Sequence, residues 1–412
     1  MIGLVVNPVA GVGGPAGLAG SDGADVQRLA LARGARSRVQ ERAVLALTTL
    51  AERHPGLVVT TAAGAMGADA VRAAGLVPCV VGSGPFVDSA GQPDSGGQPD
   101  LTSGAGDGGA ESRATDAGDT VRAVASLAAA GVDLILVVGG DGTLRDAVAG
   151  LGAEEHPSEA GADVVPAVLG VPAGVKMYSP VFAVSPRAAG STAADWIDHE
   201  GLPTEEREVL DIDEAAMRRA RVDPALYGLL RVPYRSGRTQ ARKAPTPVTE
   251  AAAVEAAARG VVARMRPGVR YLLGPGGTTA EIARQLGIEG SPLGVDVVLD
   301  GAVVVRSASE NELLAAIAEG PAQAVITVIG GQGFLLGRGN QQLSASVLRA
   351  IGDDPLLVVA PEQKLIDLHG RPLLVDTGDP ELDARLAGHV RIVTGVGASS
   401  LYAVSAPDLI SV

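Results

Sequence analysis

The chain has 412 residues, enough for two or three domains, and a formal charge of −14 from 33 Lys and Arg against 47 Asp and Glu. A single cysteine excludes a disulfide framework and a cysteine-cluster zinc site, and the acid excess argues against a nucleic-acid-binding protein. No apolar run is long enough for a membrane span, and residues 2–6 lack the basic flank of a signal peptide. We therefore expect a cytoplasmic protein with an aliphatic core.

Strand and helix patterns alternate through the first half of the chain, which is typical of βαβ units and a parallel sheet. Short Val/Ile/Leu runs bounded by glycine or proline predict buried strands at residues 2–6, 57–60, 79–82, 133–138 and 164–169. Helices are predicted at 39–53, 119–130 and 144–151, and an Ala-rich helix between the second and third strands. Residues 83–116 are rich in Gly, Ser, Asp, Pro and Gln, which predicts a disordered surface insert.

The composition shifts to mixed charge near residue 203, which suggests the start of a second domain. Helices are predicted there at 249–264 and 311–318, and strands at 271–273, 294–299, 324–329, 390–394 and 402–405. We expect an α/β protein with three parts. Residues 1–200 form the N-terminal domain, 201–390 the C-terminal substrate or nucleotide domain, and 391–412 strands that pack back on the body.

Several predicted strands end in glycine-rich turns. These turns follow Val6, Val138, Leu169, Leu273 and Ile329. Ligands of open α/β sheets bind outside the carboxyl ends of the strands. Glycine lets backbone N–H groups curve around an anion, and a helix N-terminus adds partial positive charge. The pattern therefore predicts a phosphate site at this edge of the sheet.

The most specific of these turns is Gly139-Gly140-Asp141-Gly142-Thr143, between a buried strand and a helix. Its glycines can surround a polyphosphate, and Thr143 can donate a hydroxyl or cap the helix. A carboxylate repels phosphate, so Asp141 makes sense as a Mg²⁺ contact, direct or through water, or as a base for an attacking hydroxyl. The alternative is a tight turn in which Asp141 is the helix N-cap.

This five-residue turn resembles the GGDGT signature of the NAD kinase, diacylglycerol kinase and 6-phosphofructokinase superfamily. The opening, residues 3–11, is similar to its first strand and N-P-x-[AS]-G turn. More closely, the chain resembles the ATP-NAD kinase/AcoX-like branch (the acetoin catabolism protein X group). The segments that carry this likeness are residues 20–23, 171–179, 276–279, 329–342 and 375–378.

The resemblance implies an NAD kinase-like fold, with a Rossmann-like N-terminal domain and a second mixed α/β, β-rich domain. It implies Mg²⁺-dependent phosphoryl transfer from ATP, or from polyphosphate, to a hydroxyl of NAD or a related small molecule. Carried over, Asp141 is the catalytic acidic residue, and Asn7 belongs to the first phosphate-side turn. The residues at the phosphates are Gly139, Gly140, Gly142 and Thr143. The resemblance further implies a homo-oligomer, without a nucleic-acid or membrane partner.

The chain also departs from the well-studied NAD kinases. These carry an Asn-Glu pair that holds the nucleotide, and a glycine turn of the type G-x-N-x-G-x-L-G-F. Here the turn after Leu169 reads Gly-Val-Pro-Ala-Gly-Val-Lys, and the only Asn-Glu pair, Asn311-Glu312, is interpreted as a helix cap. NAD is therefore a weaker expectation as the acceptor than kinase chemistry is.

Other candidates have two interpretations each. Lys176 can hold a phosphate or be a solvated lysine, and Gly276, Gly277 and Thr278 form a second anion site or ordinary capping. Asp376 binds metal or substrate hydroxyls, or is a turn aspartate, which we favour. A basic stretch, residues 231–243, neutralises a phosphorylated substrate or is a charged surface loop.

Three functions remain open from the sequence. The first is an ATP-dependent small-molecule kinase. The second is a nucleotide-binding regulatory protein that has lost catalysis, which the altered turn at residues 170–176 motivates. The third is a lipid kinase, for which the sequence offers no basic amphipathic helix.

Overall fold

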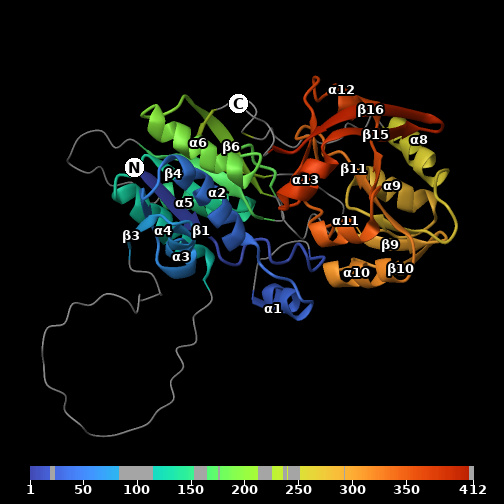
Figure 1. Cartoon of the computed structure of the whole chain (residues 1–412), viewed down its shortest axis with the longest axis horizontal. Helices are drawn as coiled ribbons and strands as arrows, with labels where there is room; N and C mark the ends of the chain where they lie inside the picture. The colour runs from blue at the N-terminus through green and yellow to red at the C-terminus, as the bar shows by residue number, and fades with distance from the viewer. Residues whose placement is uncertain are drawn as a thin grey trace, which may run out of the picture.

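The computed structural model describes residues 1–18, 24–82, 115–152, 165–174, 177–211, 225–234, 239, 251–291 and 293–407. Two α/β domains lie side by side (Figure 1), the N-terminal one in blue and green and the C-terminal one in yellow to red. The predicted insert at 83–116 lies outside the described residues except for Thr115 and Asp116, and Asp116 is the N-cap of the next helix. Within the described part of the chain, no helix is long and apolar enough to span a bilayer.

The N-terminal domain is built on a parallel sheet of five strands in the order β3-β2-β1-β4-β5. Strand β4, which lies between β1 and β5, is buried along its whole length, because helices cover both faces of the sheet. The predicted parallel α/β architecture is confirmed. The strands are β1 (Ile2–Val6), β2 (Val58–Thr61), β3 (Val77–Val80), β4 (Leu134–Gly139) and β5 (Ala167–Pro172).

The helices of this domain pack in two pairs. Helices α2 (Val39–Arg53) and α6 (Pro186–Asp198) contact each other and cover β4 and β5 on one face, whereas α4 (Ala117–Ala129) and α5 (Asp141–Gly152) cover the other. Asp116 and Asp119 form a capping box at the start of α4, in which each side chain accepts a hydrogen bond from the backbone N–H of the other residue. The shorter elements are α1 (Ala24–Ala32), η1 (Gly64–Met66) and α3 (Ala68–Ala73).

The end of β5 differs from the prediction. The sequence predicts a turn directly after Leu169, but the strand continues to Pro172, and Gly170, Val171 and Pro172 pair with residues 137–139 of β4. A proline is tolerated here because β5 is an edge strand. Gly170 is needed within the strand, since a Cβ at this position would lie 2.5 Å from the ring of Phe182. The turn therefore begins at Ala173.

The C-terminal domain contains a mixed sheet of nine strands in the order β10-β9-β8-β11-β13-β15-β16-β14-β12, as the predicted second domain requires. Strands β8, β11, β13 and β15 run parallel, and β9 is antiparallel to both of its neighbours. Strand β16 is antiparallel to β15 and parallel to β14. The C-terminal strands β15 and β16 lie within the sheet. The strands are β8 (Arg270–Leu273), β9 (Asp296–Leu299), β10 (Ala302–Val305), β11 (Ala322–Thr327), β12 (Phe334–Leu336), β13 (Leu356–Val359), β14 (Leu373–Val375), β15 (Gly388–Gly395) and β16 (Ala398–Ser405).

Alternation of side chains along these strands separates two cores. On β11, Ala324 and Ile326 join one core and Val325 joins the other, because successive residues of a strand point to opposite faces. Helix α8 (Ala251–Val262) covers the Val325 face, and α10 (Glu310–Ala318) and α11 (Ala345–Ile351) cover the opposite one. The other helices are α9 (Gly277–Gln285), α12 (Glu362–Ile366) and α13 (Pro380–Leu386).

A two-stranded sheet follows α6. Strands β6 (Thr204–Asp211) and β7 (Ala225–Pro233) are antiparallel, and their side chains Val209, Leu230 and Val232 belong to the core of the N-terminal domain. The end of β6 brings Leu210 and Asp211 beside the start of α5.

The domains are joined by a buried ion cluster centred on Asp376, just after β14. Arg42 of α2 donates to both carboxylate oxygens, at 3.0 and 3.1 Å, and Arg338 donates to one at 2.8 Å. The same two arginines donate to Pro172 O and Val184 O of the N-terminal domain, at 2.9 and 3.0 Å. Burial alone would raise the pKa of Asp376, but the two guanidinium groups outweigh it and hold the pKa below its usual value. Asp376 is therefore not the simple turn aspartate that the sequence favoured.

We expect Asp376→Asn to lower the free energy of unfolding by about 3–5 kcal/mol, because two buried guanidinium groups lose their counter-charge. Urea denaturation of the full chain measures the effect. Asp69→Asn is the matched control: its exposed pair with Arg72 should contribute less than about 1 kcal/mol. Equal effects of the two substitutions would contradict a special role of the buried cluster.

Candidate active site

The GGDGT turn joins β4 to α5. Gly139 is the last residue of the strand and Asp141 is the first of the helix, so the predicted strand–turn–helix context is present. A Cβ on Gly139 would lie 2.2 Å from Thr143 Oγ1, which leaves room only for glycine. The carbonyl of Gly140 accepts hydrogen bonds from the N–H groups of Thr143 and Leu144, at 3.0 and 3.1 Å, and fixes the first turn of α5.

Glycine turns from three parallel strands meet at this edge of the sheet. A Cβ on Gly174 would lie 2.3 Å from Gly140 Cα, and one on Gly11, where φ is +73°, would lie 2.2 Å from Ala173 O. The backbones after β1, β4 and β5 therefore approach more closely than any side chain allows. Asn7 Nδ2 also donates to Thr143 Oγ1 at 3.2 Å. Of the predicted phosphate residues, the structure thus brings together Asn7, Gly139, Gly140, Gly142 and Thr143.

Asp141 is buried, with 1% of its surface exposed. Its carboxylate accepts hydrogen bonds from Tyr178 N at 2.6 Å, Ser179 N at 3.1 Å and Ser179 Oγ at 2.6 Å. It therefore binds the backbone of the loop after β5, and not the N–H groups of its own helix as an N-cap would. Burial raises the pKa of Asp141 to about 6, against the lowering effect of these bonds, and the nearby charge of Asp211 raises it further.

The loop that holds Asp141 is also a wall of an open pocket. Met177 lines the pocket, and the next two residues, Tyr178 and Ser179, hold the carboxylate. Ser179 Oγ in turn accepts a hydrogen bond from Leu210 N at 3.0 Å, which anchors the loop to β6. Asp141 itself lies behind this wall and does not line the pocket.

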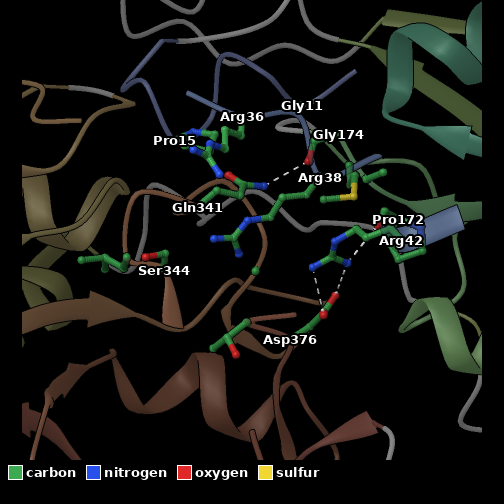
Figure 2. Close-up of a pocket in the computed structure, with 15 residues that line it drawn as sticks. Gly11, Pro15, Arg36, Arg38, Arg42, Pro172, Gly174, Gln341, Ser344 and Asp376 are labelled. Carbon is green, nitrogen blue, oxygen red and sulfur yellow. Dashed lines mark hydrogen bonds and ion pairs between the residues drawn. The ribbon is translucent and has the colours of Figure 1, made fainter. Parts of the chain in front are cut away.

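The pocket lies between the domains and is open to solvent, and the empty space in it, open solvent included, is about 560 Å³. Figure 2 shows Arg36, Arg38 and Arg42 from the N-terminal domain facing Gln341, Ser344 and Asp376 from the C-terminal domain. Gln341 Nε2 donates to Gly174 O at 3.0 Å and closes the pocket toward the glycine turns. The remaining lining residues are Gly11, Pro15, Pro172, Ala173, Gly174, Met177, Gly337, Leu343 and Thr377.

The second glycine turn, Gly276-Gly277-Thr278, lies at the carboxyl end of β8 and begins α9. Thr279 Oγ1 donates to Gly276 O at 2.8 Å, whereas Thr278 Oγ1 is buried with no partner in the described part of the chain. Thr327 Oγ1, on the strand beside Gly276, is buried and unpartnered in the same way. No hydrogen bond between described residues joins this turn to residues 139–143.

Several candidates have other outcomes. Lys176 and residues 20–23 lie outside the described residues, as does the basic stretch at 231–243 except residues 231–234 and 239. The interpretation of Asn311-Glu312 as a helix cap is confirmed, because Glu312 and Ser309 form a capping box at α10.

The site carries oxygen ligands of the kind that Mg²⁺ prefers. Asp141 and Asp211 are close enough for the charge of one to raise the pKa of the other. Among the described residues, no group of three His, Cys, Asp or Glu side chains could hold a metal ion. Asp211 is paired with Arg145 at 3.2 Å, and Asp141 accepts three hydrogen bonds, so a Mg²⁺ ion at this edge would be held mainly by a ligand's phosphates.

Sequence reasoning missed the arginines of the pocket and the loop that binds Asp141. Arg36, Arg38 and Arg42 lie just before and within the first turn of α2. A cluster of basic residues in an acidic chain was the signal that could have indicated a binding site there. The contacts of Tyr178 and Ser179 had no local signal, because they join residues 37 and 38 positions apart.

A five-stranded parallel domain and a mixed-sheet domain, with glycine turns and a pocket between them, define a two-domain α/β protein of the kinase type. Residues 2–201 match the family model described as the ATP-NAD kinase N-terminal domain, and residues 266–404 match the ATP-NAD kinase C-terminal domain. The chain belongs to the ATP-NAD kinase family. No curated protein and no solved structure matches it, and the resemblance to the AcoX-like branch stays a prediction.

We expect Gly174→Ala to lower the free energy of unfolding by about 1–3 kcal/mol, because the new Cβ overlaps backbone that no side-chain rotation can move. Gly152→Ala is the matched control, since a Cβ at that helix end meets no atom within 4 Å. Urea denaturation of both variants tests the close approach of the two turns. Equal stability of Gly174→Ala and the wild type would show that the turns are not packed backbone against backbone.

Proposed function

We propose that the protein is an ATP-dependent kinase that transfers a phosphoryl group to a hydroxyl of NAD or a related metabolite. The observation that carries the proposal is the position of Asp141. It opens a helix at the junction of three glycine turns, directly behind the wall of an interdomain pocket. The match of both domains to the ATP-NAD kinase family supports the same chemistry.

In this proposal the donor phosphates lie on residues 139–143, at the positive end of the α5 helix dipole. Asn7 and Thr143 place an amide and a hydroxyl at the same edge. Gly276, Gly277 and Thr278 supply a second phosphate contact, for which the unpartnered hydroxyl of Thr278 is available. Lys176, which follows Gly174-Val175 in the sequence, stays a predicted phosphate contact.

Asp141 accepts the proton of the attacking hydroxyl. A pKa of about 6 suits this role, because the carboxylate is largely ionised at neutral pH and is still a stronger base than an ordinary aspartate. The acceptor reaches Asp141 only when the loop of Tyr178 and Ser179 releases its hydrogen bonds. We therefore propose that acceptor binding moves this loop.

Asp141 would contact a Mg²⁺ ion, directly or through water, and that ion would supply neutralisation of the phosphate charge. In this proposal the protein's own residues bind the donor phosphates, orient the acceptor and remove the proton of its hydroxyl. Four further statements stay predictions: that the donor is ATP rather than polyphosphate, that the product is NADP, that the protein is cytoplasmic, and that it is a homo-oligomer.

The alternative is a nucleotide-binding regulatory protein. The favouring observation is that the carboxylate of Asp141 is covered and accepts three hydrogen bonds. The two functions differ in one result, since only the kinase releases ADP when ATP, Mg²⁺ and an acceptor are present.

We expect Asp141→Asn to abolish ADP release with ATP, Mg²⁺ and NAD⁺ or a panel of hydroxyl metabolites. The amide keeps the shape of the side chain but cannot accept the proton. Circular dichroism and ATP titration check that folding and nucleotide binding persist, and Asp69→Asn is the control for loss of an aspartate charge. Full turnover by Asp141→Asn would refute the assignment, and wild-type binding of ATP without turnover would favour the regulatory function.

The pH dependence of kcat/KM gives a second test. The burial-raised pKa predicts that activity falls as pH drops through about 6, where Asp141 takes up a proton. Ser179→Ala should move this midpoint to higher pH, because the Ser179 hydroxyl lowers the pKa of Asp141. Ser126→Ala, which removes an exposed hydroxyl on α4, should leave it unchanged. An unshifted midpoint in Ser179→Ala would mean that another group controls the acid limb.

A further inference from the structure

The interdomain pocket gathers positive charge in an acidic protein. Arg36, Arg38 and Arg42 all line it, and all three come from the segment that enters α2 (Figure 2). Asp376 is the one carboxylate among the lining residues, in a chain with a formal charge of −14. The lining of the pocket is therefore positively charged although the chain as a whole is negative. No residue of the GGDGT turn contributes to this charge.

Nearby carboxylates pair with two of these arginines, Arg42 with Asp376 and Arg38 with Glu310, and leave Arg36 without a counter-charge among the described residues. Asp376 is already occupied by Arg42 and by the buried Arg338. Glu310 accepts a hydrogen bond from Ser344 Oγ at 2.5 Å and lies 3.8 Å from Arg38. Arg36 is exposed and has no hydrogen bond or ion pair within the residues that the structure describes. Arg36 thus keeps its donors for a ligand, and Arg38 makes only the long contact with Glu310.

The start of α2 strengthens the field at this point. Arg38 is the N-cap residue of this 15-residue helix and makes no side-chain capping bond. The positive end of a helix dipole favours an anion, whereas here it is surrounded by guanidinium groups. At this helix end, Val39 N donates to Ser37 Oγ at 3.4 Å. An anionic ligand would relieve the repulsion between the arginines.

We propose that Arg36 and Arg38 form a subsite for the phosphate or diphosphate group of a substrate, on the side of the pocket away from Asp376. Guanidinium groups bind such oxyanions through paired hydrogen bonds. Across the pocket, Gln341 Oε1 has no partner within the described chain and offers an acceptor to a hydroxyl of the same ligand.

The subsite deepens the proposed function and rests on it for the identity of the ligand. Gly174 is a wall of the pocket and packs against Gly140, so a ligand held by the arginines lies next to the GGDGT turn. The bound group therefore belongs either to the phosphoryl acceptor, such as the diphosphate of NAD⁺, or to the donor. Both sources share the same chemistry, and binding measurements separate them.

Equilibrium titration of the full chain with inorganic pyrophosphate tests the subsite without turnover. We expect at least tenfold weaker binding by the double variant Arg36→Gln/Arg38→Gln. Arg36→Gln alone should give a partial loss, and it should fold normally because this exposed side chain has no described partner to lose. Arg72→Gln, which removes an exposed charge on α3, is the control and should bind as the wild type does.

Titrations with NAD⁺ and with ADP identify the source of the anion. Weaker binding of NAD⁺ alone assigns the subsite to the acceptor, and weaker binding of ADP alone assigns it to the donor. The proposal is overturned if the wild type does not bind pyrophosphate, if the double variant binds it equally well, or if Arg72→Gln loses as much affinity. It is also overturned if neither nucleotide is affected. Because ADP release is measured separately, failure of kinase activity and failure of the subsite are distinguishable.

Discussion

The buried cluster of Arg42, Arg338 and Asp376 is the interaction on which the interdomain geometry depends. A carboxylate withdrawn from water is tolerated only with full compensation, and here two guanidinium groups supply it. The same guanidinium groups hold the carbonyls of Pro172 and Val184, so the charge cluster also fixes the backbone after β5 against the C-terminal domain. The pocket keeps its walls because neither domain can shift without exposing unpaired charge.

Close backbone packing is the second constraint, and it acts on the N-terminal side of the pocket. Gly174 against Gly140, and Gly11 against Ala173, bring three strand ends into contact at distances that exclude a Cβ. The positive end of the α5 helix dipole lies at this sheet edge. Such an edge attracts anions whatever the identity of the ligand.

Asp141 connects these constraints to chemistry. Its burial raises the pKa toward neutrality, while the loop of Tyr178 and Ser179 stabilises the ionised form by hydrogen bonds. The same loop separates the carboxylate from the pocket, so basicity and access are controlled by one segment. In the kinase that we propose, this segment moves when the acceptor binds. The arginines that line the pocket would attract a negatively charged ligand.

Short-range patterns in the sequence determined the strands, the helices that follow them and the glycine turns between, because burial and turn chemistry act over a few residues. This is why β1, β4, α2 and the GGDGT turn were predicted closely, and why the capping role of Glu312 was correct. The sequence placed the end of β5 too early, since the pairing of Gly170–Pro172 depends on β4 and not on local preference. Only the tertiary structure decided that Arg42 meets Asp376, 334 positions away, and that Ser179 covers Asp141. Contacts of this kind arise when separate elements bury charge together, and no local pattern records which partner will be nearest.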